Sequence, residues 1–308
     1  MKNEFDFIEY LKRTLSKGRL KTGIGDDAAV FAAGRGDLVW TTDAVVDGVD
    51  FHLKKLSAEA VGRKTLAINL SDVAAMGARP ESFTLSLGIP AGMPETWLKR
   101  FYRGMMELAA KYHVTCAGGD VSRSRVFFAS VSMLGRTAAG HAVLRSGARS
   151  GDWIGVTGSL GGSIAEHHHA FEPRIREGMA LARKRIRSMM DISDGLVQDL
   201  RHLLRASHAA ARLNLEAVPL SREALKLAKG DRGKALNHAL TDGEDFELLF
   251  TVSPRTRLEL EMSWARRFPR TPLAWIGRIE KGKPGGIAWF RNGRKIAFRL
   301  DKEGYGHF

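Results

Sequence analysis

The stretch TTDAVVDGVDF, residues 41–51, places three aspartates at and after the end of a short apolar segment, Leu38 to Thr42, that is typical of a β-strand. This pattern predicts that Asp43 lies at the C-terminal end of the strand. Asp47 precedes Gly48, and an Asp-Gly pair is typical of a tight turn. The stretch therefore predicts a strand that ends in a turn rich in carboxylates.

Acidic residues stand beside glycines in several other short segments: GIGDDAAV (23–30), GGD (118–120), DISDGL (191–196) and DGEDFELLF (242–250). Glycine adopts positive φ without strain, so these segments are predicted to be tight turns that hold carboxylates at the ends of elements. Together with Asp72 and residues 41–51 they contain thirteen of the 34 acidic residues. Lys and Arg number 48 and give a net charge of +14, so this concentration of acids predicts one shared acidic site.

Hydrophobic periodicity predicts helices and strands on both sides of residue 138. In the first part, Ser57 is expected to N-cap a helix to about Ala75 that carries Asn69 and Asp72 on one face, and a second helix follows Pro94. The other expected elements are strands over 83–87, 114–117, 126–134, 153–156, 246–252, 273–279, 286–291 and 294–299, and helices over 179–187, 196–207 and 255–268. The predicted fold class is α/β (α+β-like), with two packed α/β domains at residues 1–138 and 139–308 whose acidic turns face one cleft.

The composition argues against several classes of protein. No stretch approaches 18 apolar residues without a charge, and the N-terminal residues lack the apolar core of a signal peptide, so no membrane association is expected. The single cysteine, Cys116, cannot form an intramolecular disulfide and is typical of a reducing compartment, which predicts a cytoplasmic protein. The basic residues are scattered and match no nucleic-acid-binding motif, so they favour a basic surface that attracts anionic substrates.

Carboxylates gathered in glycine-rich turns favour magnesium chemistry. Mg²⁺ prefers oxygen ligands and is typically held by a few carboxylates together with substrate phosphates. Several acidic turns predict several ions, which suits a reaction in which one phosphate attacks the terminal phosphate of ATP. Such a transfer needs positioning and charge neutralisation, so no protein nucleophile is expected.

Other kinds of site fit the sequence less well. No G-x-x-x-x-G-K-[ST] phosphate loop occurs, and GIGDDA follows a polar stretch where a dinucleotide-binding turn requires a strand. The segment Gly158-Ser-Leu-Gly161-Gly162 fits a phosphate cradle and a plain strand–helix turn about equally. The only histidine cluster, at 167–169, consists of consecutive side chains that diverge, so zinc is not expected. A serine hydrolase is not expected, because G-x-S-x-G is absent.

The acidic segments, together with NLSDVAAMGA (69–78), LRSGARSGD (144–152) and GYGHF (304–308), resemble the thiamine-monophosphate kinase family, in the family's order and over nearly the whole chain. The first segments are shared in looser form by a superfamily that includes aminoimidazole ribonucleotide synthetase, selenophosphate synthetase and a hydrogenase-maturation protein. The resemblance implies domains of the aminoimidazole ribonucleotide synthetase-like type. It also implies phosphorylation of thiamine monophosphate by ATP, the last step of thiamine diphosphate biosynthesis, and a homodimer built on the N-terminal domains.

The resemblance further implies roles for individual residues, matched by their place in the family's motifs. Magnesium ligands are expected at Asp27, Thr41, Thr42, Asp43, Asp72, Asp120, Asp191 and Asp194. ATP contacts are expected at Tyr102, Gly119, Asp120, Arg145 and Ser193. Contacts with thiamine monophosphate are expected at Asp50, Glu244 and Tyr305, where Asp50 stands in place of a His of some relatives.

Two other functions stay open on the sequence. A synthetase or dehydratase of the same superfamily would keep the fold and the use of ATP but change the reaction; the absence of a Cys before the first glycine motif disfavours selenophosphate synthetase. A basic nucleic-acid-binding protein would use the net charge of +14. Clustered carboxylates would repel the phosphate backbone of its partner, so this second reading is the weaker.

Overall fold

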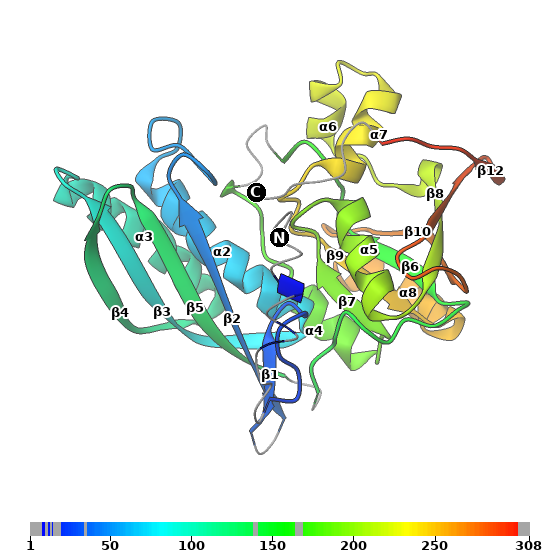
Figure 1. Ribbon diagram of the computed structural model, residues 1–308, viewed down its shortest axis with the longest axis horizontal. Helices are drawn as coiled ribbons and strands as arrows, with labels where there is room; N and C mark the ends of the chain where they lie inside the picture. Colours follow the sequence, from blue (N-terminus) through cyan, green and yellow to red (C-terminus); the bar gives the residue numbers. More distant parts are fainter. Residues whose placement is uncertain are drawn as a thin grey trace.

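A computed structural model describes residues 8, 9, 12, 14, 20–33, 36–137, 141–163 and 169–300 of the chain. Two β-sheets, each accompanied by helices, lie side by side (Figure 1). The first sheet is built from strands up to Thr137 and the second from strands that begin at Trp153. The predicted α/β class with two packed units is confirmed. None of the described helices is long and apolar enough to cross a membrane.

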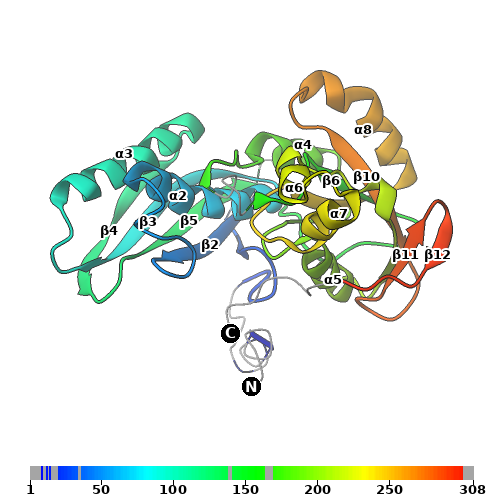
Figure 2. The same cartoon turned by 90° about the horizontal axis from the view of Figure 1, so that it is seen from above.

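The N-terminal sheet has five strands in the order β1-β2-β5-β3-β4. Its strands are β1 (Ala29–Ala32), β2 (Asp37–Val46), β3 (Ala78–Pro90), β4 (Thr115–Ser124) and β5 (Phe128–Thr137). The helices α2 (Ala58–Ala75) and α3 (Glu95–Tyr112) lie on the same side of this sheet (Figure 2). Alternate residues of β3, such as Phe83, Leu85 and Leu87, are buried, as their period of two predicts.

None of the helices in the described part of the chain covers the other face of this sheet (Figure 2). Neighbouring strands place small side chains there in two cross-strand rows, one with Thr42, Ser132 and Thr84 and the next with Ala44, Ser130, Ser86 and Asp120. Thr84 and Ser86 are exposed, and Trp40 on the same strand as Thr42 is 51% exposed. We call this surface, which carries Trp40, Thr42, Thr84, Ser86 and Asp120, the open face.

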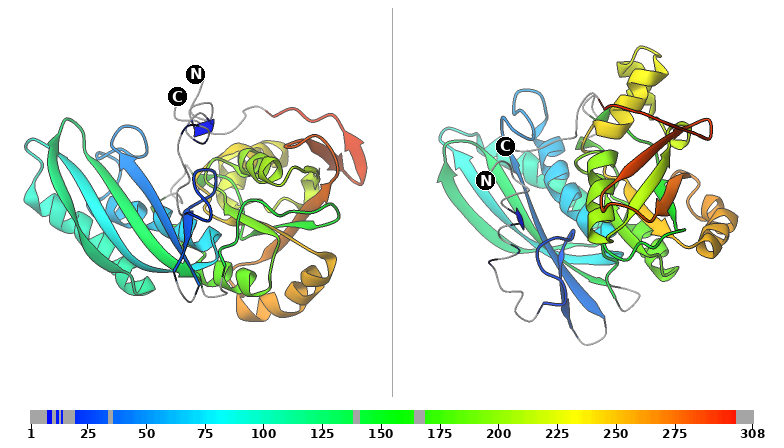
Figure 3. Two further views of the ribbon diagram at one scale, coloured as in Figure 1. Left: turned by 60° about the horizontal axis from the view of Figure 1, so that its bottom comes forward. Right: turned by 45° about the vertical axis from the view of Figure 1, so that its right-hand side comes forward.

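Helix α2 begins and ends as its sequence predicts. The Ser57 side chain accepts a hydrogen bond from the Ala60 backbone N–H at 3.1 Å, which caps the first turn. The helix ends at Met76, and Gly77 follows with φ of +65°, a conformation that glycine adopts without strain. Most of α2 is buried, because the helix packs against both units (Figure 3). Its Ser71 hydroxyl donates to Asp191 of the second unit at 2.6 Å.

The second sheet has seven strands in the order β12-β11-β8-β10-β6-β9-β7. Its strands are β6 (Trp153–Thr157), β7 (Ser188–Asp191), β8 (Ala210–Asn214), β9 (Leu248–Val252), β10 (Leu273–Glu280), β11 (Ile287–Arg291) and β12 (Arg294–Ile296). The helices of this unit are α4 (Ile175–Arg183), α5 (Leu196–Ala206), the 3₁₀ helix η3 (Leu215–Ala217), α6 (Arg222–Leu227), α7 (Arg232–Thr241) and α8 (Pro254–Arg267). The edge strand β7 ends at Asp191, so this acidic turn faces the N-terminal unit.

Two strands extend further than the sequence predicted. Asp43 lies inside β2, because β2 continues to Val46 in antiparallel pairing with β5. Gly118, Gly119 and Asp120 lie inside β4, which pairs in parallel with β3 and places Asp120 beside Ser86. The prediction of a turn at residues 118–120 was wrong, and the strand that was predicted to end at Asp43 continues to Val46, because pairing between distant segments decides where these strands end.

Candidate active site

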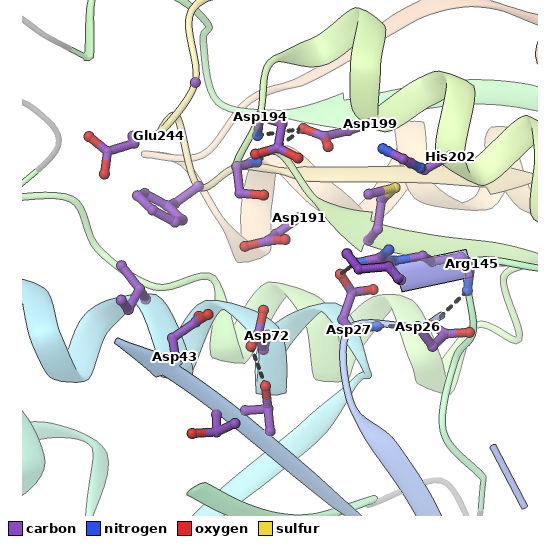
Figure 4. Close-up of a pocket in the computed structure, with 18 of the residues that line it drawn as sticks. Asp26, Asp27, Asp43, Asp72, Arg145, Asp191, Asp194, Asp199, His202 and Glu244 are labelled. Carbon is purple, nitrogen blue, oxygen red and sulfur yellow. Dashed lines mark hydrogen bonds and ion pairs between the residues drawn. The ribbon is translucent and has the colours of Figure 1, made fainter. Parts of the chain in front are cut away.

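A cavity of about 1010 Å³ lies between the two units and is lined by side chains from both. The acidic side chains of this cavity come from segments far apart in the sequence (Figure 4). Most of the predicted site residues line it, namely Asp27, Thr41, Thr42, Asp43, Asp50, Asp72, Arg145, Asp191, Ser193, Asp194 and Glu244. The predicted convergence of acidic segments on one cleft is therefore a feature of the structure.

Three carboxylates lie closest together in this cavity. One oxygen from each of Asp27, Asp72 and Asp191 lies within 4.8 Å of the other two. Asp72 accepts a hydrogen bond from the Thr41 hydroxyl, and Asp191 accepts one from Ser71. The Oδ2 atom of Asp27 is buried and has no hydrogen-bond partner. A buried carboxylate oxygen without a hydrogen-bond donor is costly, and a cation bound at this atom would offset that cost.

Burial and mutual repulsion disfavour the charged form of these carboxylates. Burial is the main cause that raises the pKa of Asp43 to about 6 and the pKa of Asp191 to about 7, and neighbouring carboxylates add to both shifts. Burial, with the charges of Asp43 and Asp191, also raises the pKa of Asp72 well above its usual range. A divalent cation among these oxygens would reverse this penalty, and an all-oxygen donor set suits Mg²⁺. The residues present therefore fit magnesium.

Arg145 holds the two aspartates that precede β1. Its side chain donates to Asp27 Oδ1 at 2.8 Å, and its backbone N–H donates to Asp26 Oδ1 at 3.0 Å. Burial and the charge of Asp27 raise the pKa of Asp26 to about 7. The Nε atom of Arg145 is buried without a hydrogen-bond partner. Arg145 is thus an integral part of the cavity wall.

Asp199 of the second unit positions the turn before α5. It was not among the predicted site residues. Asp199 accepts hydrogen bonds from the backbone N–H groups of Ser193 at 3.1 Å and Asp194 at 3.0 Å. An acid in the first turn of a helix that follows an Asp-Gly turn is the signal that would have indicated it. His202, one turn further along α5, also lines the cavity, and burial lowers its pKa to about 4, so its ring is neutral at pH 7.

In the turn of residues 242–246, only one of the acids lines the cavity. The backbone N–H of Gly161 donates to Asp245 at 2.9 Å, and that of Gly162 donates to Asp242 at 3.0 Å. The glycine segment after β6 therefore binds carboxylates of its own chain, which favours the plain turn over a phosphate cradle. Glu244 has φ of +64°, and its side chain is 36% exposed at the cavity.

The wall opposite this turn is formed by Asp50 and by Lys64 of α2. The Asp50 carboxylate accepts from the Val46 backbone N–H at 2.8 Å, which closes the loop after β2. Lys64 donates to the Asp50 carbonyl at 2.9 Å and to Glu244 Oε1 at 2.5 Å. The sequence interpretation did not include Lys64, although it lies eight residues before Asp72 and thus on the same face of the helix.

The remaining predicted contacts do not line this cavity. Tyr102 of α3 and Gly119 and Asp120 of β4 are absent from its lining. Since β4 is three strands away from β2 in the sheet, these β4 residues lie roughly 14 Å from β2. Tyr305 and the histidines at 167 and 168 lie outside the described residues.

Known proteins are similar to this chain over nearly its whole length. The family description "AIR synthase related protein, N-terminal domain" matches residues 25–137, and "AIR synthase related protein, C-terminal domain" matches residues 134–289. Thiamine-monophosphate kinase of Rhodopirellula baltica is 37% identical over 99% of this chain and 97% of its own length. A solved structure described as AaThiL complexed with AMPPCP and TMP is similar with a TM-score of 0.81 and 32% identity, covering 99% of this chain and 97% of that chain.

A second structure, thiamine-monophosphate kinase from Stenotrophomonas maltophilia, gives a TM-score of 0.75 at 33% identity and covers 94% of this chain and 96% of that chain. These similarities extend over both units of the chain. The chain therefore belongs to the thiamine-monophosphate kinase family.

Proposed function

We propose that the chain transfers the terminal phosphate of ATP to thiamine monophosphate, which gives thiamine diphosphate and ADP. The relatives named thiamine-monophosphate kinase and the similar structure with AMPPCP and TMP support this reaction. The observation that carries the proposal is the convergence of acidic segments from both units on one cavity. A cavity that brings a nucleotide and a second phosphate together needs this concentration of cation ligands.

Magnesium ions would be held by Asp27, Asp72 and Asp191, with Asp43 and Asp194 beside them. The buried, unpartnered Oδ2 of Asp27 supports this assignment. Bound Mg²⁺ supplies neutralisation of phosphate charge in such a site. Thr41 and Ser71 orient the carboxylates of Asp72 and Asp191, so their oxygens already face a common point without a ligand.

The two ends of the cavity differ in charge, which suggests how the substrates lie. The cationic Arg145 is at one end and the acidic Glu244 at the other, with Asp72 and Asp191 between them (Figure 4). Lys12 and Arg205 also line the cavity. We place the nucleotide phosphates at the Arg145 end and the cationic thiazolium ring at Glu244. A phosphate oxygen of thiamine monophosphate then attacks the γ-phosphorus as the bond to the β-phosphate oxygen breaks, and no residue becomes phosphorylated.

A homodimer through the open face is part of this proposal. An uncovered sheet face of small side chains can pack flat against a second sheet. Asp120 lies in one row of this face, beside Ser86. A second copy seated there meets Asp120, so we propose that the ATP contacts expected of Gly119 and Asp120 are made across the dimer.

Release of ADP in the presence of Mg-ATP tests the reaction. We expect ADP to appear only when thiamine monophosphate is added, with thiamine diphosphate as the second product in equal amount. A synthetase of the same superfamily would instead release ADP with a different acceptor and form no thiamine diphosphate. A nucleic-acid-binding protein would release none, and either result would overturn the proposal.

A further inference from the structure

Lys64 is the only fully buried lysine or arginine among the residues that the structure describes. It is 1% exposed, yet its side chain lines the cavity together with Ile68 and Asp72. These three residues are spaced by four along α2 and therefore form one row on the helix. Lys64 lies at one end of this row, about 12 Å along the helix axis from Asp72.

The ammonium group of Lys64 joins the two walls of the cavity. It donates to the Asp50 carbonyl oxygen at 2.9 Å, and this loop belongs to the N-terminal unit. It also donates to Glu244 Oε1 at 2.5 Å, across a sequence separation of 180 residues, and Glu244 belongs to the second unit. The ion pair therefore crosses the cleft beside the proposed site for the acceptor substrate.

The backbone of Glu244 is in an uncommon conformation. Its φ of +64° is in the left-handed region, and its backbone N–H donates to the Ser193 carbonyl at 2.7 Å. The carboxylate is 36% exposed, whereas the Lys64 side chain is 2% exposed. Both side chains line the cavity, but the carboxylate of Glu244 is far more accessible to a substrate there than the ammonium group of Lys64.

Stability alone does not account for this pair. Burying a lysine removes its charge from water, and an apolar side chain of similar size is often as good for folding as a buried ion pair. At the cavity, by contrast, a fixed carboxylate is useful, because a cationic ring is bound best by an anion that is already oriented.

We propose that Lys64 is a positioning residue for the acceptor substrate, which fixes Glu244 toward the cationic ring of thiamine monophosphate and fixes the loop at Asp50 opposite to it. This role rests on the proposed function. The nucleotide end of the cavity, at Arg145, does not depend on it.

The test compares Lys64→Met, Glu244→Gln and the double variant in steady-state kinetics for both substrates. We expect Lys64→Met to raise KM for thiamine monophosphate about tenfold and to leave KM for ATP within about twofold of wild type. Because Lys64 acts through Glu244, the double variant should be no worse than Glu244→Gln alone by more than about twofold. Calorimetric binding of thiamine monophosphate to protein loaded with Mg-AMPPCP should show the same ranking.

Arg63→Met is the matched control, since Arg63 precedes Lys64 on α2 and pairs with Glu172 outside the cavity. It should leave both KM values unchanged. If Lys64→Met does not fold, as judged by thermal melting, Lys64→Gln keeps a hydrogen-bond donor and is scored in the same way.

Equal changes in both KM values, or a lower melting temperature with unchanged kinetics, would show a merely structural role and overturn the proposal. If the increases in KM for thiamine monophosphate of the two single variants multiply in the double variant, Lys64 does not act through Glu244. A wild-type protein that releases no ADP with thiamine monophosphate overturns the proposed function and this role with it. If the wild type is active and Lys64→Met has the wild-type KM values, only the role of Lys64 is overturned.

Discussion

At the scale of one residue, Asp72 is suited to bind a cation but destabilises the fold when no cation is bound. Its carboxylate accepts from Thr41 and lies within 4.8 Å of Asp27 and Asp191 through their oxygens. Burial and those charges raise its pKa well above the usual range. A raised carboxyl pKa means that the ionised group destabilises the fold when no cation is bound.

We therefore expect Asp72→Asn to abolish turnover while it leaves the melting temperature of the magnesium-free protein unchanged or raises it by a few degrees. Turnover is measured as ADP release and stability by thermal melting in a chelator. Glu95→Gln, at an exposed acid on α3, is the control and should change neither quantity. Near-normal activity of Asp72→Asn at limiting magnesium would remove Asp72 from the metal site.

The same carboxylates predict a pH dependence of stability. Asp26 and Asp191 have pKa values of about 7 in the folded chain, above the usual carboxyl value of 3.8. Because the folded pKa is raised, protonation stabilises the fold as the pH falls through 7. His202, with its pKa lowered to about 4, acts in the opposite direction, but only below pH 6.5, where the unfolded imidazole becomes protonated.

In a chelator, the melting temperature should therefore rise by a few degrees between pH 8 and pH 6.5. Saturating magnesium should remove or invert this trend, because the bound cation favours the ionised carboxylates. A metal-free melting temperature that stays level or falls over this interval would show that the carboxylates are ionised in the fold.

At the scale of an element, α2 is held close to its neighbour by two glycines. A Cβ atom on Gly104 of α3 would lie 2.1 Å from the Glu59 carbonyl oxygen of α2, and one on Gly62 would lie 1.9 Å from the Phe101 carbonyl oxygen. The two helix backbones therefore touch. This contact fixes the position of α2, and with it the positions of Lys64 and Asp72 at the cavity.

Gly104→Ala should force the helices apart and destabilise the protein by about 1–3 kcal/mol, in spite of the better helix propensity of alanine. Activity should fall with it, because α2 carries Lys64 at the Glu244 end of the cavity and Asp72 in its middle. Gly233→Ala in α7 is the matched control, since its Cβ would meet only a side-chain oxygen of Asp231 at 3.2 Å. A melting temperature of Gly104→Ala equal to that of the control would contradict this account of the packing.

Elements whose ends are set by local contacts were predictable, and those set by pairing were not. The start of α2 follows from Ser57 and the start of α3 from Pro94, both visible in the sequence. The extent of β2 and β4 depends on partners in β5 and β3, so Asp43 was placed at a strand end and Asp120 in a turn. Lys64 was missed because it is an ordinary helical residue until the second unit brings Glu244 to it. Asp199 was missed although its partners, Ser193 and Asp194, are only six and five residues before it.

At the scale of the whole molecule, the prediction of one cleft succeeded because the acidic segments and their order carry the information. Three residues that were predicted to bind ATP do not line this cavity. Tyr102, Gly119 and Asp120 lie away from it, although the resemblance assigns them to ATP. A single chain therefore does not bring together all of the residues expected to bind the nucleotide, whereas a dimer through the open face offers Asp120 to the second copy.

We accordingly expect a dimer in solution, with an interface of at least about 1,200 Å². Thr84→Arg places a long charged side chain in the middle of the open face, where Thr84 is exposed, and should give a folded monomer with greatly reduced kcat/KM for ATP. Met262→Arg, at an 86% exposed position on α8, is the control and should stay dimeric and active. Light scattering after size exclusion gives the mass, and ADP release gives the activity. A monomeric wild type with full activity, or a Thr84→Arg monomer with the wild-type kcat/KM for ATP, would show that one chain suffices for the reaction.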